Sequence, residues 1–333
     1  MNTSSSSSLR QAWAVAFTTA AVATLPIAAA AAEHESPAQL VAALHSAFGE
    51  HHVRAVHSKG IILEGRFAPT AEARKLSHSS LFAGATLPIT VRFSDFTGLP
   101  DIPDTAGAAN PRGFAVKFHL ADGVEADVVN HSFNGFPTAN ADEFAQLLRA
   151  LGASGPDAPK PTALDRFLGS HPIAATFLTT QKPAPVSYAS LTYFGVTAFA
   201  FTDAHDRRTC VRYRFVPKGG EHLLDADALR AKGPNYLQEE IAQHVAAGPF
   251  QFDWYAQVAG PGDIIDNPSI AWPEARRLVK LGTLTIDRLA PDQPAADKAL
   301  LFLPSRVPAG IEPADPMIAI RSASYPISFG ERQ

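Results

Sequence analysis

Cysteine is nearly absent from this sequence. The 333 residues contain one, Cys210, so no disulfide can form within the chain, and a zinc site built on cysteine pairs is excluded. Core packing and any cofactor must therefore hold the fold together. Cys210 lies in the stretch TCVRYRF, which predicts a buried position on a strand.

The sequence also lacks a strong charge of either sign and the common catalytic signatures. Its formal net charge is −4, with no run of five like charges. Binding to nucleic acid or to an anionic membrane surface depends on clustered positive charge, so these partners are set aside. The motifs G-x-S-x-G, G-x-G-x-x-G, Walker A and H-E-x-x-H are missing, which narrows the field of enzyme classes.

A long apolar run follows Arg10, the single positive charge near the amino terminus. Small residues then lead to an A-x-A pattern ending at Ala30 or Ala32, the layout of a secretory signal. We expect residues 1–32 to be a cleaved signal peptide, which leaves a single domain over residues 33–333 in the periplasm or another exported compartment. A retained membrane anchor is the alternative, because a run of this length can just span a bilayer.

After this run, strand-like pieces dominate. Alternating polar and β-branched or aromatic residues predict strands within 51–67, 88–96, 112–120, 125–133, 187–201, 210–218, 250–260 and 278–289. Capping residues and apolar periodicity predict helices at 36–48, 140–152, 166–177 and 235–248, and a closing helix from Asp315. The predicted fold is α+β, with a meandering antiparallel sheet closed as a barrel or packed as a sandwich.

Four stretches hold polar residues that a plain β-domain does not need: VRAVHSKG, VRFSDF, DVVNHSFNGF and the closing helix. Singly, each has a structural explanation. His57 fits a hydrogen-bonded core histidine, Arg54 and Arg92 fit solvated strand edges, and Tyr325 fits a core tyrosine with its hydroxyl at the rim. Arg321 and Tyr325 lie four apart and share one helix face. The argument for a site rests on the combination.

A metal site at the histidine-rich start of the first strand is disfavoured. His51 and His52 are neighbours, and neighbouring strand residues point to opposite faces. A site that joins them to His57 therefore needs irregular backbone.

Six stretches in order resemble the haem catalases over roughly residues 36–333: VRAVHSKG, TLPITVRFSDF, NPRGFAVKFHLADGVEADVVNHSFNGFPTANADEF, YLQEEIAQHVAAGPFQFDW, LGTLTIDRL and DPMIAIRSASYPISFGER. The pairing of NPRGFAVKF with VRFS is quite specific. The short length and the export signal are similar to the catalase-related peroxidases, also called mini-catalases. The resemblance implies the catalase-like haem-dependent fold, an antiparallel β-barrel core with surrounding helices.

On the proximal side of the cofactor, the resemblance implies that Tyr325 is the tyrosinate axial ligand of ferric haem b. Arg321, one turn earlier, assists the phenolate. Arg54, Arg92 and Arg332 are implied as partners of the haem propionates.

On the distal side, the resemblance implies that His57 is the acid–base residue. It takes a proton from the iron-bound peroxide oxygen and returns it to the departing oxygen, so that a ferryl intermediate with a porphyrin radical forms. Ser94 is implied as its polar neighbour, Val56 as a channel wall and Phe144 as a ring stacked near the haem. Because Arg54 and His57 are three apart, we expect a bend between them or a long reach by Arg54.

The sequence departs from the large catalases in two respects. Where they have a distal asparagine, an ungapped match puts His131 in this chain, with Asn130 just before it. A slip of one residue would flip the face of the strand, so we assign the distal partner to His131. The large catalases also have a long amino-terminal arm and a carboxy-terminal domain, which the matching stretches of this sequence do not include. We therefore expect a more open haem edge, no nucleotide site, and a monomer or homodimer.

The function predicted on this basis is an exported haem peroxidase (EC 1.11.1.-). It reduces hydrogen peroxide or an organic hydroperoxide with a small organic electron donor. The alternatives are a weak true catalase, a hydroperoxide-rearranging haem enzyme, and a non-catalytic barrel that binds haem or another apolar ligand. A carrier has no need of His57 with Ser94, which favours an enzyme.

Overall fold

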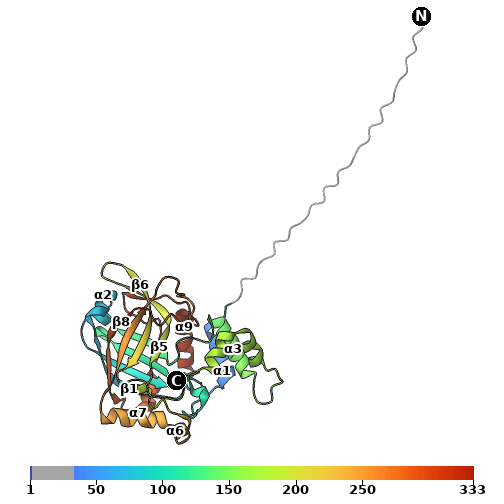
Figure 1. Cartoon of the computed structure of the whole chain (residues 1–333), viewed down its shortest axis with the longest axis horizontal. Coiled ribbons are helices and arrows are strands. Elements are labelled where there is room, and N and C mark those ends of the chain that lie inside the picture. Colours follow the sequence, from blue (N-terminus) through green and yellow to red (C-terminus); the bar gives the residue numbers. More distant parts are fainter. Residues whose placement is uncertain (2–33) are drawn as a thin grey trace. The chain divides into compact units, whose positions relative to one another are not determined.

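Eight antiparallel strands form a closed barrel in the computed structural model, which describes Met1 and residues 34–333 (Figure 1). They are β1 Gly60–Pro69, β2 Leu87–Ser94, β3 Gly113–His119, β4 Glu125–His131, β5 Tyr193–Thr202, β6 Arg208–Pro217, β7 Phe250–Val258 and β8 Leu278–Leu289. The order is β4-β3-β2-β1-β8-β7-β6-β5, and the pairing of His131 with Phe194 joins β4 to β5. A short strand, β9 Ile311–Pro313, pairs with β5 in the antiparallel sense. The predicted barrel is confirmed; apart from Met1, the predicted signal peptide lies outside the described residues.

Helices surround the barrel (Figure 1). They are α1 Pro37–Phe48, α2 Ala71–Leu76, α3 Ala141–Gly152, α4 Ala163–Ser170, α5 Pro172–Thr179, α6 Ala226–Arg230, α7 Tyr236–Ala247, α8 Gln293–Ala299 and α9 Met317–Gly330. The amino-terminal α1 packs against both α3 and the carboxy-terminal α9, so the two ends of the described fold meet. Residues Glu35–Gln333 form one compact unit.

Aromatic side chains fill the barrel. Phe93, Phe114 and Phe252 lie within 6.3 Å of one another, measured between ring centroids, and Trp254 stacks on Phe215 at 5.3 Å. All are at most 1% exposed. Because successive strand residues point to opposite faces, filling the interior with these rings leaves the alternate positions facing outward.

The segment before β1 differs from the sequence prediction. Residues 51–59, predicted as strand, form an irregular loop, and His52 and His57 have φ angles of 54° and 57°. Backbone of this left-handed kind is uncommon outside glycine and signals a local constraint. It supplies the bend expected between Arg54 and His57.

Two further predictions need correction. The helix predicted at 166–177 is two helices, because Pro172 opens α5 at a position where its missing N–H costs nothing. Cys210 lies on β6 as predicted, but it is half-buried and not buried. The closing helix begins at Met317, and the Asp315 carboxylate accepts a hydrogen bond from the Met317 N–H at 2.9 Å.

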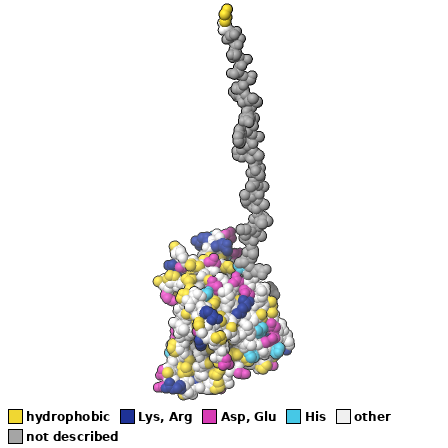
Figure 2. Space-filling model, turned by 90° about the vertical axis from the view of Figure 1, so that its right-hand side faces the viewer, with side chains coloured by type: hydrophobic (Ala, Val, Ile, Leu, Met, Phe, Trp, Pro, Cys, Tyr) yellow, Lys and Arg dark blue, Asp and Glu magenta, His cyan; other side chains and the backbone are white. Residues whose placement is uncertain are grey.

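Within residues 34–333, no helix is both long and apolar enough to cross a membrane. The face in Figure 2 carries basic, acidic and apolar side chains interspersed. This mixed surface agrees with the weak net charge of the sequence.

Candidate active site

A single cavity on the outer side of β2, β3 and β4 collects the residues that the sequence singled out. It is covered by α1, α3 and α9, and its empty space, including the mouth, is about 1390 Å³. The lining includes every predicted site residue, together with Asn130, the alternative to His131: Arg54, Val56, His57, Arg92, Ser94, Asn130, His131, Phe144, Arg321, Tyr325 and Arg332. Residues from both ends of the described fold therefore meet at one place.

Strand register explains which side chains face this cavity. Ser94, Gly113 and His131 are direct partners across β2, β3 and β4, and so they form one row. The side-chain Nδ2 of Asn130 instead donates to the Phe114 carbonyl oxygen at 3.0 Å. Alternation along β4 thus directs His131 to the cavity side, as the sequence argument preferred. Gly113, which the sequence argument did not single out, leaves room between the two polar residues.

His57, in the irregular loop of residues 51–59 (the bent loop), stands beside Ser94 at the end of β2. Its Nδ1 lies 3.1 Å from the Ser94 Oγ, and its backbone N–H donates to the Phe96 carbonyl at 3.1 Å. Burial lowers the pKa of His57 to about 3, helped by His131 and by the positive charge of Arg92. The imidazole is therefore neutral at physiological pH, and Nε2 is the nitrogen left for a substrate.

The tautomer of His131 follows from its backbone contact. Nδ1 accepts the Phe133 N–H at 3.3 Å, so in the neutral ring Nε2 carries the proton. Burial, with the charge of Arg321, lowers the pKa of His131 to about 3 and keeps the ring neutral. Nε2 is buried and has no hydrogen-bond partner among the described residues. The site thus holds a hydrogen-bond donor with nothing to donate to.

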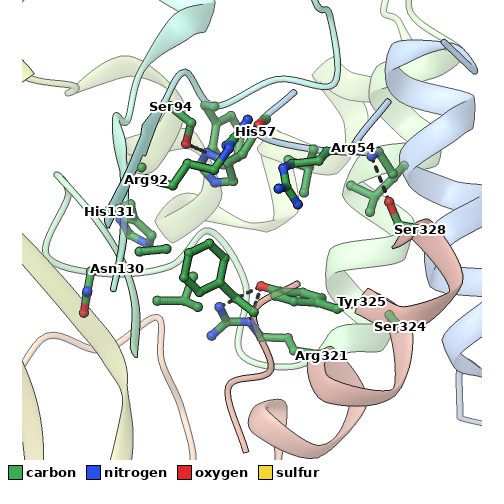
Figure 3. A pocket seen from close by; sticks show the side chains of 18 of the residues that line it. Arg54, His57, Arg92, Ser94, Asn130, His131, Arg321, Ser324, Tyr325 and Ser328 are labelled. Atoms are coloured by element: carbon green, nitrogen blue, oxygen red, sulfur yellow. Dashed lines mark hydrogen bonds between the residues drawn. The ribbon is translucent and has the colours of Figure 1, made fainter. Parts of the chain in front are cut away.

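Tyr325 and Arg321 lie opposite the histidines, on α9 (Figure 3). The Tyr325 phenolic oxygen accepts hydrogen bonds from Nε and Nη2 of Arg321 at 3.1 and 2.9 Å. The bent loop is joined to this helix, because the Ser328 Oγ accepts the Ala55 N–H at 3.0 Å. An electron-rich oxygen and a pair of neutral imidazoles therefore face each other across the cavity.

A cluster of cations lies at the cavity edge around Asp297, a residue of α8 that the sequence argument missed. Its Oδ1 accepts hydrogen bonds from Nε of Arg92 at 2.7 Å and from Nη2 of Arg54 at 3.3 Å. Arg332 and Arg54 both donate to the Leu300 carbonyl oxygen, at 2.6 and 2.9 Å. No sequence motif marks Asp297, because its role depends on contacts with chain segments more than 200 residues away.

The charges of this cluster do not balance. Three guanidinium groups surround one carboxylate, and Nε of both Arg54 and Arg332 is buried without a partner among the residues described. Burial lowers the pKa of Arg332 to about 10 and that of Arg54 well below its ordinary value. Buried cations with unused donors are costly, so the cluster fits a ligand that brings about two negative charges.

The cavity as a whole fits a macrocyclic dicarboxylate such as haem. Its lining is largely apolar, one edge is cationic, and one wall supplies a phenolic oxygen. Among the described residues, no group of three or more histidine, cysteine or acidic side chains is placed to hold a bare metal ion. The Tyr325 oxygen, on the wall opposite the histidines, is of the kind that can ligate haem iron.

Comparison with known proteins decides the family. The Catalase family model matches residues 45–332. The chain belongs to the catalase family. It is 34% identical over 308 residues to the catalase-related peroxidase of Synechococcus elongatus, covering 91% of this chain and 90% of that protein. It is 36% identical over 279 residues to the catalase-related peroxidase of Mycolicibacterium paratuberculosis, covering 83% and 87% of the two chains.

Solved structures of catalases share the fold. A fungal catalase superposes with a TM-score of 0.75 at 21% identity, and catalase A from Saccharomyces cerevisiae with 0.75 at 20% identity. Each comparison covers 84% of this chain but only 59% and 61% of the longer proteins. The barrel of this catalase-family chain is thus common to both, and its own cavity residues must carry the case for function.

Proposed function

We propose that this chain is an exported haem peroxidase that reduces hydrogen peroxide or an organic hydroperoxide at the expense of a small organic donor. The observation that carries the proposal is the placement of the His57–Ser94 pair and the Tyr325–Arg321 pair on opposite walls of one cavity (Figure 3). The names of the two catalase-related peroxidases compared above agree with it. Export is supported by the layout of residues 1–32 alone.

The proximal and edge residues would hold the cofactor. Tyr325 is the iron ligand as tyrosinate, and the two N–H groups of Arg321 stabilise negative charge on its oxygen. Arg54, Arg92 and Arg332 bind the two carboxylates of haem b. When bound, the haem would supply the two electrons that reduce the peroxide.

The distal residues move and place protons. Because His57 is neutral, Nε2 accepts the proton of an incoming hydroperoxide when Nδ1–H donates to the Ser94 hydroxyl, which can act as acceptor. His57 then returns the proton to the departing oxygen, which leaves as water or alcohol and not as an anion. The Nε2–H of His131 has no other partner and donates to one of the peroxide oxygens.

A small organic donor then completes turnover by returning electrons in one-electron steps.

The proposed function is tested by mixing the haem-loaded protein with hydrogen peroxide, with and without a phenolic donor, while recording donor oxidation and dissolved oxygen. Donor oxidation without oxygen release is expected. Oxygen release without a donor would make the protein a catalase in activity as well as in family, and a protein that does neither would contradict the proposal.

A further inference from the structure

We propose that Tyr188 is a redox-active residue, which gives one electron to the peroxide-oxidised haem and its phenolic proton to Asp95. This inference rests on the haem peroxidase function proposed above. It concerns a buried group behind the distal wall, in η4 Tyr188–Ser190, that the peroxide reaction itself does not use.

The phenol of Tyr188 is paired with a base inside the fold. Its hydroxyl donates to Oδ1 of Asp95 at 3.0 Å, and both residues are 0% exposed. Asp95 follows Ser94 in the chain, so the base sits directly behind the distal site. Arg112 donates to the same carboxylate oxygen, while Oδ2 of Asp95 is buried with no partner in the part of the chain that the structure describes.

This base distinguishes Tyr188 from its neighbours. Tyr193 donates its hydroxyl to the Tyr188 carbonyl and Tyr236 to the Pro185 carbonyl, each at 2.8 Å. A phenol that loses an electron becomes a strong acid and must release its proton, and a backbone carbonyl cannot take it at neutral pH, whereas a carboxylate can. Tyr255 also faces a carboxylate, that of Asp253, but at 3.5 Å.

A stack of rings holds Tyr188 against the barrel interior, behind the cavity wall. Its ring lies 5.3 Å from that of Phe93 with the planes 11° apart, and Phe93 lies 5.0 Å from Phe114 at 24°. The ring of Phe114 points into the barrel, on the other side of β3 from the cavity. The link from Tyr188 to a cofactor in the cavity is therefore its hydrogen bond to Asp95, which directly follows the cavity-lining Ser94, and the electron crosses only buried protein.

The step balances within these groups. The O–H bond of Tyr188 breaks, one electron reduces the oxidised haem by one equivalent, and the proton forms an O–H bond on Asp95. The products are a neutral tyrosyl radical and a neutral carboxylic acid. Burial already raises the pKa of Asp95 to about 6 against the opposing effect of Arg112, so accepting a proton costs this carboxyl less than it would cost an exposed one. One oxidising equivalent is thereby stored inside the barrel until an organic donor returns the electron.

The test is electron paramagnetic resonance of the haem-loaded full chain, frozen after mixing with one equivalent of hydrogen peroxide in the absence of donor. A tyrosyl signal is expected in the wild type and a loss of at least about fivefold in Tyr188→Phe. Tyr193→Phe is the matched control: it removes one hydroxyl from the same ring cluster, but that hydroxyl donates to a carbonyl, so the signal should remain. Asp95→Asn retains the phenol and removes the base, and it should also lose the signal.

Two results would overturn the inference: no tyrosyl signal in the wild type, or an undiminished signal in Tyr188→Phe. The optical spectrum of each sample separates this failure from failure of the proposed function. If the haem band does not respond to peroxide, the peroxidase proposal falls and the radical falls with it. If the band responds and no Tyr188 radical forms, only the inference about Tyr188 is wrong.

Discussion

Ser94 and His131 occupy the same row of the barrel sheet, with Gly113 between them. Strand register therefore fixes the spacing of two of the distal polar groups, and the bent loop carries the third, His57, to Ser94. Because barrel strands are held on both sides by neighbours, such a site is more rigid than one built from loops alone.

The absence of a side chain at Gly113 is the first testable feature. A Cβ there would lie 2.3 Å from the Ser94 Oγ and 2.7 Å from Nδ1 of His57, so Gly113→Ala must displace both. We expect the rate constant for reaction with peroxide to fall by about 10²-fold, since ~1 Å of misplacement has this effect in active sites, while haem still binds. Gly107→Ala is the control, because its Cβ would meet nothing within 4 Å. Stopped-flow absorption measures both, and an unchanged rate in Gly113→Ala would contradict the assigned geometry.

Replacement of His57 tests the proton-transfer role. His57→Ala should slow the reaction with peroxide by about 10²- to 10⁴-fold, the range for loss of a general acid–base group, and leave haem content unchanged. His205→Ala, at an exposed position, is expected to behave as wild type. A His57→Ala protein that reacts at the wild-type rate would return His57 to a structural role and favour a barrel that binds its ligand without turnover.

The pKa values of His57 and His131 predict how stability depends on pH. In the folded chain both are lowered to about 3, mainly by burial, whereas an unfolded histidine titrates near ~6.5. Between these values the unfolded state binds more protons, so the free energy of unfolding should fall as the pH is lowered from about 6.5 towards 3. Urea unfolding of the haem-free chain at several pH values measures this slope.

A double variant, His57→Gln with His131→Gln, isolates the contribution of these two groups. Its pH slope between 6.5 and 3 should be shallower than that of the wild type, and that of His205→Gln should not change. Equal slopes in all three proteins would show that the two cavity histidines are not held neutral by the fold.

Asp297 offers a test of the charge balance at the cavity edge. Asp297→Asn keeps an oxygen for Arg92 but removes one negative charge beside three guanidinium groups. Added positive charge near bound haem favours the reduced iron, so the midpoint potential should rise. The control is Glu312→Gln on β9, which removes an equal charge from an exposed ion pair with Arg208 of β6 and should leave the potential unchanged. Spectroelectrochemical titration decides, and equal potentials in Asp297→Asn and wild type would exclude Asp297 from the cofactor site.

Much of the fold was readable from local pattern. The strands around Arg92, Phe114 and His131 send successive residues to opposite faces, apolar rings inward and polar or small residues outward, and this period of two is what a barrel wall requires. Most of their residues are buried, because the outer face is covered as well. The loop at 51–59 was misread because its composition resembles a strand, whereas its path is set by contacts with Phe96 and Ser328 that lie far off in sequence. The helix break at Pro172 was in principle visible, since proline favours a first helical turn.

Much of the candidate site depends on long-range contacts. The proximity of Tyr325 to the distal loop arises only because α9 packs against α1, and Asp297 meets its arginines only after α8 folds onto the cavity edge. The row that joins Ser94, Gly113 and His131 needs the register of three strands. Residue types and a family resemblance nominated the site, and tertiary packing defined its geometry.

The most direct test of the central claim is the absorption spectrum of Tyr325→Phe reconstituted with ferric haem, recorded beside the wild type before and after addition of hydrogen peroxide. The substitution removes the phenolic oxygen that accepts both N–H groups of Arg321 and changes little volume. The account predicts a tyrosinate-ferric spectrum that responds to peroxide in the wild type, and in the variant a loss of those ligand features with weaker retention of haem. A variant that holds haem with an unchanged spectrum and an unchanged peroxide response would show that Tyr325 is not the iron ligand.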